Sequence, residues 1–186
     1  MSQLRHFIGL MSGTSADAID AALVGFESDG TTQLICTHTL ELPADLKTRI
    51  IAAQTRADTT IRDVCEQDVA LSLLYAAAVE ALIEKANVPA SKIEAIGNHG
   101  QTLLHAPEAD HPFTLQIGDN HRLAELLGIT VVGDFRRRDI AAGGQGAPLV
   151  PAFHRTLVSQ TETAAFLNVG GIANISVIAP DQVSGF

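Results

Sequence analysis

The segment Gly9–Asp20 combines the residue types that suit a phosphate site. Gly9 and Gly13 permit close backbone approaches, and the hydroxyls of Ser12, Thr14 and Ser15 add donors beside exposed N–H groups, a combination that favours phosphate oxygens. Asp17 and Asp20 could position a water-coordinated Mg²⁺. The same residue types also favour an ordinary hairpin turn, and no Gly-Lys-Ser/Thr of a Walker A loop is present.

A second polar segment, Asn98–Thr102, follows an apolar run. Asn98, Gln101 and Thr102 can hydrogen-bond a polyhydroxylated ligand, and His99 could act as an acid or base or serve as a structural histidine. The spacing of His99, His105 and His111 matches no familiar zinc pattern, so no metal site is predicted here.

A third segment, Asp134–Pro148, places three arginines beside three glycines. Arginine can hold carboxylate or phosphate through two parallel hydrogen bonds. The alternative is a surface loop in which Asp134 and Asp139 pair with the arginines. The fourth segment, Asn168–Ser176, repeats the design of the first, an apolar strand on either side of a Gly turn, and two such hairpins could hold the phosphates of a nucleotide from two sides.

The elements that must position these segments alternate between strand and helix. Each predicted strand is a short apolar run, and each predicted helix follows helical spacing or begins and ends at breakers. The predicted strands are His6–Leu10, Ile19–Phe26, Gln33–Leu42, Ile93–Gly97, Phe113–Ile117, Thr130–Gly133, Ala164–Val169 and Asn174–Ile178. The predicted helices are Ala44–Gln54, Thr60–Asn87 with Thr59 or Thr60 as its cap, His121–Leu127 and Pro151–Ser159. This alternation predicts an α/β fold with a mixed sheet and flanking helices, and in such folds ligand sites collect where strands end.

Charge and cysteine content exclude several classes of function. Among the 186 residues, Lys plus Arg number 12 and Asp plus Glu number 21, a net charge of −9 that argues against broad binding of nucleic acid. Cys36 and Cys65 are far apart and lack metal-like spacing, as expected for free thiols in a reducing compartment. No signal peptide or long apolar span is visible, so we expect a cytoplasmic protein without a membrane partner.

In this order, the four segments resemble the anhydro-N-acetylmuramic acid kinases. The resemblance runs from Phe7 to Phe186, and it is carried by Gly9–Ser15, His99–Thr102, Gly133–His154 and Asn168–Asn174. It implies an actin-like, hexokinase-type (ribonuclease H-like) ATPase lobe. It also implies that ATP phosphorylates 1,6-anhydro-N-acetylmuramic acid while water opens the anhydro bond, in bacterial peptidoglycan recycling. The implied ligands are ATP, Mg²⁺ and the sugar. A homodimer is one possible oligomeric state.

The resemblance also assigns site residues. The implied ATP contacts are Gly13, Thr14, Ser15, Ala16, Asp17, Ala18, Ile19 and Asp20, with Asn168, Gly170 and Gly171 on the second hairpin. The implied sugar contacts are His99, Gly100, Gln101, Thr102 and Arg138. No protein-only metal site is implied.

Two departures from the family pattern qualify these assignments. The family has Gly where this chain has Ala18, and an Ala there would cost about 1 kcal/mol if the position needs a positive φ. The family's catalytic base is an aspartate that would follow Phe186, so no catalytic residue is assigned within the chain. We therefore expect residues 1–186 to form the N-terminal lobe of a two-lobe kinase, without its C-terminal lobe. The alternative is a fragment or pseudoenzyme that binds a ligand or partner without turnover.

Overall fold

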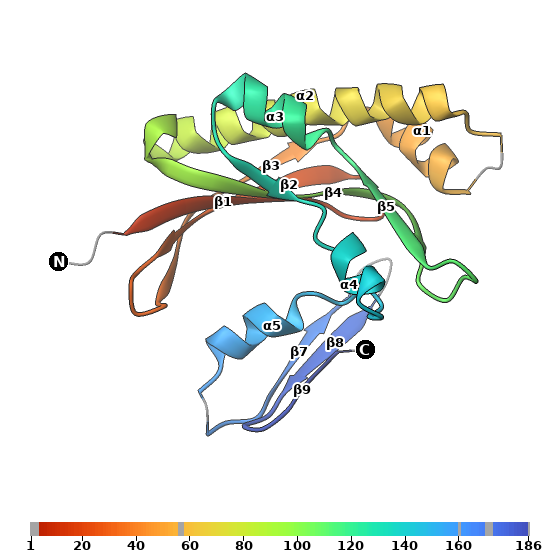
Figure 1. Cartoon of the computed structure of the whole chain (residues 1–186). Coiled ribbons are helices and arrows are strands. Elements are labelled where there is room, and N and C mark those ends of the chain that lie inside the picture. The colour runs from red at the N-terminus through yellow and green to blue at the C-terminus, as the bar shows by residue number, and fades with distance from the viewer. Residues whose placement is uncertain (1–3, 56–57, 160, 170–172, 186) are drawn as a thin grey trace. The chain divides into compact units, whose positions relative to one another are not determined.

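The computed structural model describes residues 4–55, 58–159, 161–169 and 173–185 of the chain (Figure 1). The chain divides into two compact units. The first comprises Met1–His105 and Leu115–Asp134, and the second comprises Ala106–Thr114 and Phe135–Phe186.

A six-stranded mixed sheet forms the frame of the first unit. Strand β1 pairs antiparallel with β2, which pairs antiparallel with β3, whereas β1 and β6 both pair parallel with β4. The order is β3-β2-β1-β4-β5, with β6 also paired to β4. The strands are β1 (Arg5–Ser12), β2 (Ala18–Phe26), β3 (Thr32–Glu41), β4 (Ile93–Ala106), β5 (Phe113–Ile117) and β6 (Val131–Gly133). The predicted α/β class and mixed sheet are confirmed.

Helices cover one face of this sheet, with α2 running along it (Figure 1). The helices are α1 (Ala44–Thr55), α2 (Ile61–Ala86) and α3 (Asn120–Leu127), with a short 3-10 turn η1 (Ala90–Lys92). Helix α2 packs on β2 and β3 and contacts α1 and α3. Its side chains Leu71, Tyr75, Val79 and Leu82 are fully buried with the sheet residues Ile8, Ile19, Leu23 and Ile96.

The start of α2 agrees with the prediction from the sequence, but its buried face agrees only in part. Thr60 is the N-cap, its hydroxyl accepting from the Asp63 backbone N–H while the Asp63 carboxylate accepts from the Thr60 N–H, which confirms the predicted cap. Helical spacing predicts Ile61 and Cys65 on the apolar packing face of this helix, and this prediction was wrong, because Ile61 is 84% exposed and Cys65 is exposed. Val64 is partly buried against the core, and the buried positions of the helix begin at Gln67.

Strand β4 corrects the second predicted segment. We expected the strand to end at Gly97 and a polar loop to follow, but the strand continues through Asn98–Thr102 to Ala106. Gly100 takes a φ of +73°, and the pairing with β1 shifts register between Leu10 and Ser12. The polar residues therefore lie on a bulged strand held against β1.

The second unit contains a three-stranded sheet, β7 (Ala164–Asn168), β8 (Asn174–Ile178) and β9 (Val183–Gly185), in which β8 pairs antiparallel with both neighbours. The predicted hairpin is confirmed, whereas β9 was not predicted. Helix α4 (Arg137–Ala141) interrupts the segment expected to be a loop. The helix predicted over Pro151–Ser159 is shorter, α5 (Pro151–His154) followed by the 3-10 turn η2 (Arg155–Leu157).

Among the described residues, no helix is both long and apolar enough to cross a membrane.

Candidate functional site

The turn between β1 and β2 is the centre of the first predicted site. Gly9–Ser12 belong to β1, so the turn itself is shorter than the segment read from the sequence. Gly13, Thr14 and Ser15 are exposed, and a Cβ built on Gly13 would meet nothing closer than Ser15 Oγ at 4.0 Å. Gly13 and the side chains of Thr14 and Ser15 are therefore accessible to solvent.

Ala16 fixes the shape of this turn. It takes a φ of +50° and is fully buried, and its N–H donates to Gly13 O at 3.0 Å. Ala18 is the first residue of β2 and is not among the residues with positive φ, so the strain expected there is absent. The left-handed residue of the turn is Ala16 instead, and burial of its methyl group against the core offsets part of the cost of about 1–2 kcal/mol.

The two carboxylates of the segment already have partners. Lys47 of α1 forms an ion pair with Asp17, and this hydrogen bond, with a further one from Ser15, lowers the pKa of the Asp17 carboxyl. Asp20 on β2 accepts from the Thr39 hydroxyl at 2.8 Å. Neither group is deeply buried.

A buried polar contact joins β1 to β4 directly behind the turn. Ser12 Oγ donates to Gln101 Oε1 at 2.5 Å, and both side chains are almost completely buried, at 2% and 0% exposure. Tyr75 of α2 is fully buried, and burial raises the pKa of its phenol. Gln101 thus points into the protein and supports the turn, rather than facing a ligand as predicted.

Thr102 lies on the same stretch of β4 and remains partly exposed. Its hydroxyl accepts from Gln116 Nε2 of β5 at 3.2 Å. Its carbonyl accepts from Gln54 Nε2 of α1 at 2.9 Å, and the same Gln54 nitrogen donates to Thr14 O of the turn at 3.2 Å. No sequence signal indicates that Gln54, at the end of a predicted helix, contacts both predicted segments.

Asn98 and His99 differ in their surroundings. Asn98 is 1% exposed and uses its amide internally, donating to Gly118 O at 3.2 Å and to Asn120 Oδ1 at 2.8 Å, and accepting from Gly100 N at 3.1 Å. Asn98 is therefore a structural residue. His99 is half-buried, and its Nδ1 lies 2.8 Å from Gly100 O. A carbonyl only accepts, so this contact places a proton on Nδ1.

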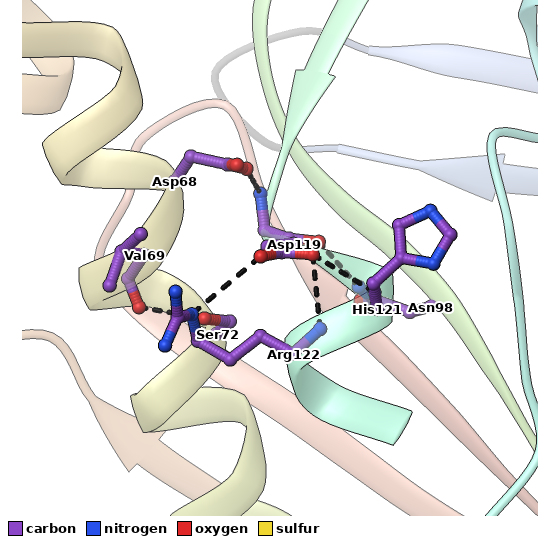
Figure 2. Close-up of polar contacts among 8 residues, drawn as sticks. Asp68, Val69, Ser72, Asn98, Asp119, His121 and Arg122 are labelled. Atoms are coloured by element: carbon purple, nitrogen blue, oxygen red, sulfur yellow. Dashed lines mark hydrogen bonds and ion pairs between the residues drawn. The ribbon is translucent and has the colours of Figure 1, made fainter. Parts of the chain in front are cut away.

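Two aspartates outside the four predicted segments hold the adjoining turn from β5 to α3 (Figure 2). Asp68 of α2 accepts from Gly118 N at 2.6 Å. Asp119 caps α3, accepting from the backbone of His121 at 2.9 Å and of Arg122 at 3.1 Å (Figure 2). Helix α2 thereby fixes the turn on which Asn98 depends. Asp119 lies two residues before the predicted helix start at His121 and directly precedes the observed start at Asn120. An Asp at the start of a helical pattern is typical of an N-cap, and this signal could have identified it.

In the second unit, Arg138 lies exposed on α4. The Asp139 carboxylate accepts from Gly146 N at 2.7 Å. Arg136 donates to Gly146 O at 2.5 Å, and burial lowers the pKa of its guanidinium. These contacts hold the Gly-rich loop in shape.

The second hairpin is described only in its strands. Asn168 is exposed and pairs with Asn174 across the hairpin, whereas Gly170 and Gly171 lie outside the described residues. Beside it, the His154 ring of α5 stacks on Phe166 with centroids 4.1 Å apart. Across the described residues, no group of three or more His, Cys, Asp and Glu side chains could hold a metal ion.

The structure therefore places the turn residues beside Gln101 and Thr102 within the first unit. Arg138 and Asn168 belong to the second unit.

Comparison with known proteins connects these features to one family. A sequence model described as "Anhydro-N-acetylmuramic acid kinase" matches residues 5–186. A protein of that name from Coxiella burnetii is 52% identical over 177 residues, covering 95% of this chain and 47% of the relative. Namesakes from Haemophilus influenzae and Vibrio cholerae are 46% and 47% identical, covering 98% and 100% of this chain but 48% and 50% of theirs.

The chain thus spans about half the length of the curated relatives it matches. Among solved structures, YeaZ from Pseudomonas aeruginosa aligns with 98% of the chain and 64% of its own at 14% identity and a TM-score of 0.32, a likeness too low to support an argument.

Proposed function

The chain belongs to the anhydro-N-acetylmuramic acid kinase family, and from this premise we propose that it forms part of an ATP-dependent kinase of 1,6-anhydro-N-acetylmuramic acid. In the proposed reaction, water adds to C1, the C1–O6 bond breaks, and O6 takes the γ-phosphoryl group of ATP. The products are N-acetylmuramic acid 6-phosphate and ADP. The pathway would be peptidoglycan recycling in the cytoplasm.

The adjacency of the β1–β2 turn to Thr102 is the observation that carries the proposal. The exposed hydroxyls of Thr14 and Ser15 follow β1, and the partly exposed Thr102 lies on the parallel neighbour β4. A kinase needs its phosphate and acceptor sites side by side, because phosphoryl transfer depends mainly on positioning and on stabilising negative charge. We propose that Gly13–Asp20 contact ATP and that Thr102 and His99 contact the sugar.

The turn suits ATP on physical grounds. Gly13, Thr14 and Ser15 are exposed, and a Cβ at Gly13 would meet no atom closer than Ser15 Oγ at 4.0 Å. When bound, Mg²⁺ would neutralise phosphate charge, and it commonly binds through phosphates and only one or two carboxylates. Asp17 and Asp20 are the carboxylates of this segment that could orient its water ligands. Their present bonds to Lys47 and Thr39 lie at the surface and can exchange with solvent.

The remaining roles belong to segments whose placement relative to the turn is part of the proposal. We propose that Arg138 binds the anionic sugar or the transferring phosphoryl group, since its exposed guanidinium can form two parallel hydrogen bonds. Asn168, Gly170 and Gly171 would contact phosphates from the second hairpin. The carboxylate that activates water would come from a part of the family's length that this chain does not span. The proposed architecture is an actin-like ATPase with two lobes, of which residues 1–186 contribute the N-terminal portion.

The test is ADP release by the full-length protein with ATP, Mg²⁺ and the anhydro sugar. We expect sugar-dependent turnover and a product that mass spectrometry identifies as the 6-phosphate of the opened sugar. N-acetylmuramic acid, which has no anhydro bond, is the matched control substrate and should give much slower turnover. Absence of sugar-dependent ADP release would refute the proposal. Turnover limited to other sugars would assign a different sugar kinase.

The same assay on residues 1–186 tests the alternative, in which the chain binds a ligand without turnover. That alternative predicts nucleotide or sugar binding by calorimetry together with no product.

A further inference from the structure

We propose that Gln54 is a positioning residue that holds the candidate phosphate turn and the candidate sugar strand in one fixed relation. The inference rests on the proposed function, because it concerns how the two halves of that site are kept in register. It adds a residue on α1, which lies outside every segment that the family resemblance singles out.

The contact geometry of Gln54 carries the inference. Its Nε2 donates to Thr14 O at 3.2 Å and to Thr102 O at 2.9 Å. A primary amide has two N–H groups on this nitrogen, so both bonds can form at once. The two acceptors are 40 and 48 residues away along the chain, and Gln54 thus ties together backbone from two segments that are distant in sequence.

Helix α1 is itself fixed against the same turn, which makes Gln54 a rigid connection rather than a loose surface contact. Leu46 and Ile50 bury one side of the helix. Lys47, two turns before Gln54 and therefore on the same side of the helix, pairs with Asp17 at the other end of the turn. The backbone just before the helix adds a bond from Leu42 N to Asp17 O at 3.0 Å.

The acceptors of Gln54 are main-chain atoms of residues whose side chains are the proposed ligand contacts. The Thr14 carbonyl belongs to the exposed turn, and the Thr102 carbonyl belongs to the residue whose hydroxyl accepts from Gln116. A shift of either backbone segment changes the distance between the phosphate and sugar positions. Small misplacements of this kind are costly in phosphoryl transfer, where most of the catalysis is positioning.

Two substitutions of Gln54 test this role in the full-length protein. Gln54→Met keeps the size of the side chain but removes both donors. Gln54→Glu keeps the shape and places a carboxylate against two carbonyl oxygens. Thr55→Ala is the matched control, because the exposed Thr55 hydroxyl donates only within its own helix, to Ile51 O at 2.9 Å.

For Gln54→Met we expect the KM values for ATP and for the sugar to rise together, each by about tenfold. Loss of structure alone would reduce the active fraction and lower kcat, with both KM values unchanged. Wild-type KM values for both substrates in Gln54→Met would overturn the proposal.

For Gln54→Glu we expect kcat/KM relative to wild type to rise as the pH falls, because the protonated carboxyl regains one donor toward a carbonyl. Thr55→Ala should show no such trend. A ratio for Gln54→Glu that is constant with pH would contradict the inference.

Hydrogen exchange separates failure of this inference from failure of the proposed function. In Gln54→Met, exchange should accelerate together in peptides covering the turn at Ala16 and β4 at Leu103, and Thr55→Ala should match wild type. If the wild-type protein shows no sugar-dependent turnover, the kinase proposal falls, and this exchange result still decides whether Gln54 joins the two segments. Acceleration in one segment without the other would overturn the inference.

Discussion

At the scale of single residues, the candidate site is held by polar side chains that bond to backbone atoms. Asn98, Gln54 and Asp68 each satisfy main-chain groups of a segment far away in sequence. Such bonds fix a loop without consuming the side chains that are to meet a ligand. The Ser12–Gln101 pair differs, because it joins two buried side chains directly.

The Ser12–Gln101 pair leads to a prediction about stability. Ser12→Ala leaves Gln101 Oε1 buried without its 2.5 Å donor, and an unsatisfied buried group of this kind costs about 1–3 kcal/mol. Urea unfolding should show the loss. Ser91→Ala, at an exposed position, is the control and should change the free energy of unfolding by no more than about 0.5 kcal/mol. Equal stability of both variants would contradict the buried pair.

The Lys47–Asp17 pair leads to a prediction about pH. The pair lowers the folded-state pKa of Asp17 below its ordinary value of 3.8. It therefore stabilises the fold above that value, and the contribution is lost as the pH falls through the folded-state pKa. The melting temperature of Lys47→Met should lie below that of wild type at neutral pH and low salt, with the difference shrinking below about pH 4. Lys92→Met, at an exposed position, should show no such convergence; a gap that persists in acid would contradict the assignment.

The roles of individual residues were only partly predictable from the sequence. The turn could be recognised from its glycines and hydroxyls, because those residue types have few uses in combination. The left-handed residue could not be located, since Ala16 and Ala18 look alike in sequence and only burial of the Ala16 methyl group distinguishes them. Gln101 could equally face a ligand or the core, and Gln54 carries no local signal at all.

At the scale of elements, hairpins and helices followed their local signals well. The β1–β2 and β7–β8 hairpins and the Thr60 cap depend on neighbouring residues, which is why periodicity and capping rules located them. The strand predicted over Ile93–Gly97 ended too early because Asn, His, Gly and Gln are poor strand formers. Pairing with β1 and β5 overrides that propensity. The predicted packing face of α2 was wrong near the start of the helix for a similar reason. Helical periodicity cannot show which part of a helix contacts the sheet.

The bulge in β4 gives a prediction at this scale. A Cβ on Gly100 would lie 2.6 Å from Ile117 O, and the φ of +73° adds strain. We expect Gly100→Ala to lower the free energy of unfolding by more than about 2 kcal/mol. Gly9→Ala is the control, because a Cβ there meets nothing within 4 Å and its φ is not positive. Thermal denaturation of the two variants should differ clearly, and similar melting temperatures would contradict the described bulge.

At the scale of the whole molecule, the chain divides into two compact units. It spans about half the length of its curated relatives. Large apolar side chains remain exposed on several elements of the first unit, including Leu34 at 64%, Leu73 at 50% and Leu126 at 50%. Composition shows how many apolar residues a chain contains, but not which of them remain exposed. This exposure became visible only in the structure.

The exposed apolar surface predicts self-association of residues 1–186. Light scattering at increasing protein concentration should show a rising mean mass, because apolar area tends to be covered by another surface. Replacing Leu73 and Leu126 with Gln should reduce the rise. A constant monomer mass at high concentration would contradict the prediction.

The bulge at Gly100 also shifts the alternation of buried and exposed positions along β4. From Ile96 onward along β4 the buried positions are Ile96, Asn98 and Gly100, and then Gln101 and Leu103, so the alternation changes phase at this one step. If the same residues alternated regularly with no bulge, Thr102 would fall on the buried face and Gln101 on the exposed one. The bulge at this one glycine therefore decides which of two neighbouring polar residues, Gln101 or Thr102, is partly exposed.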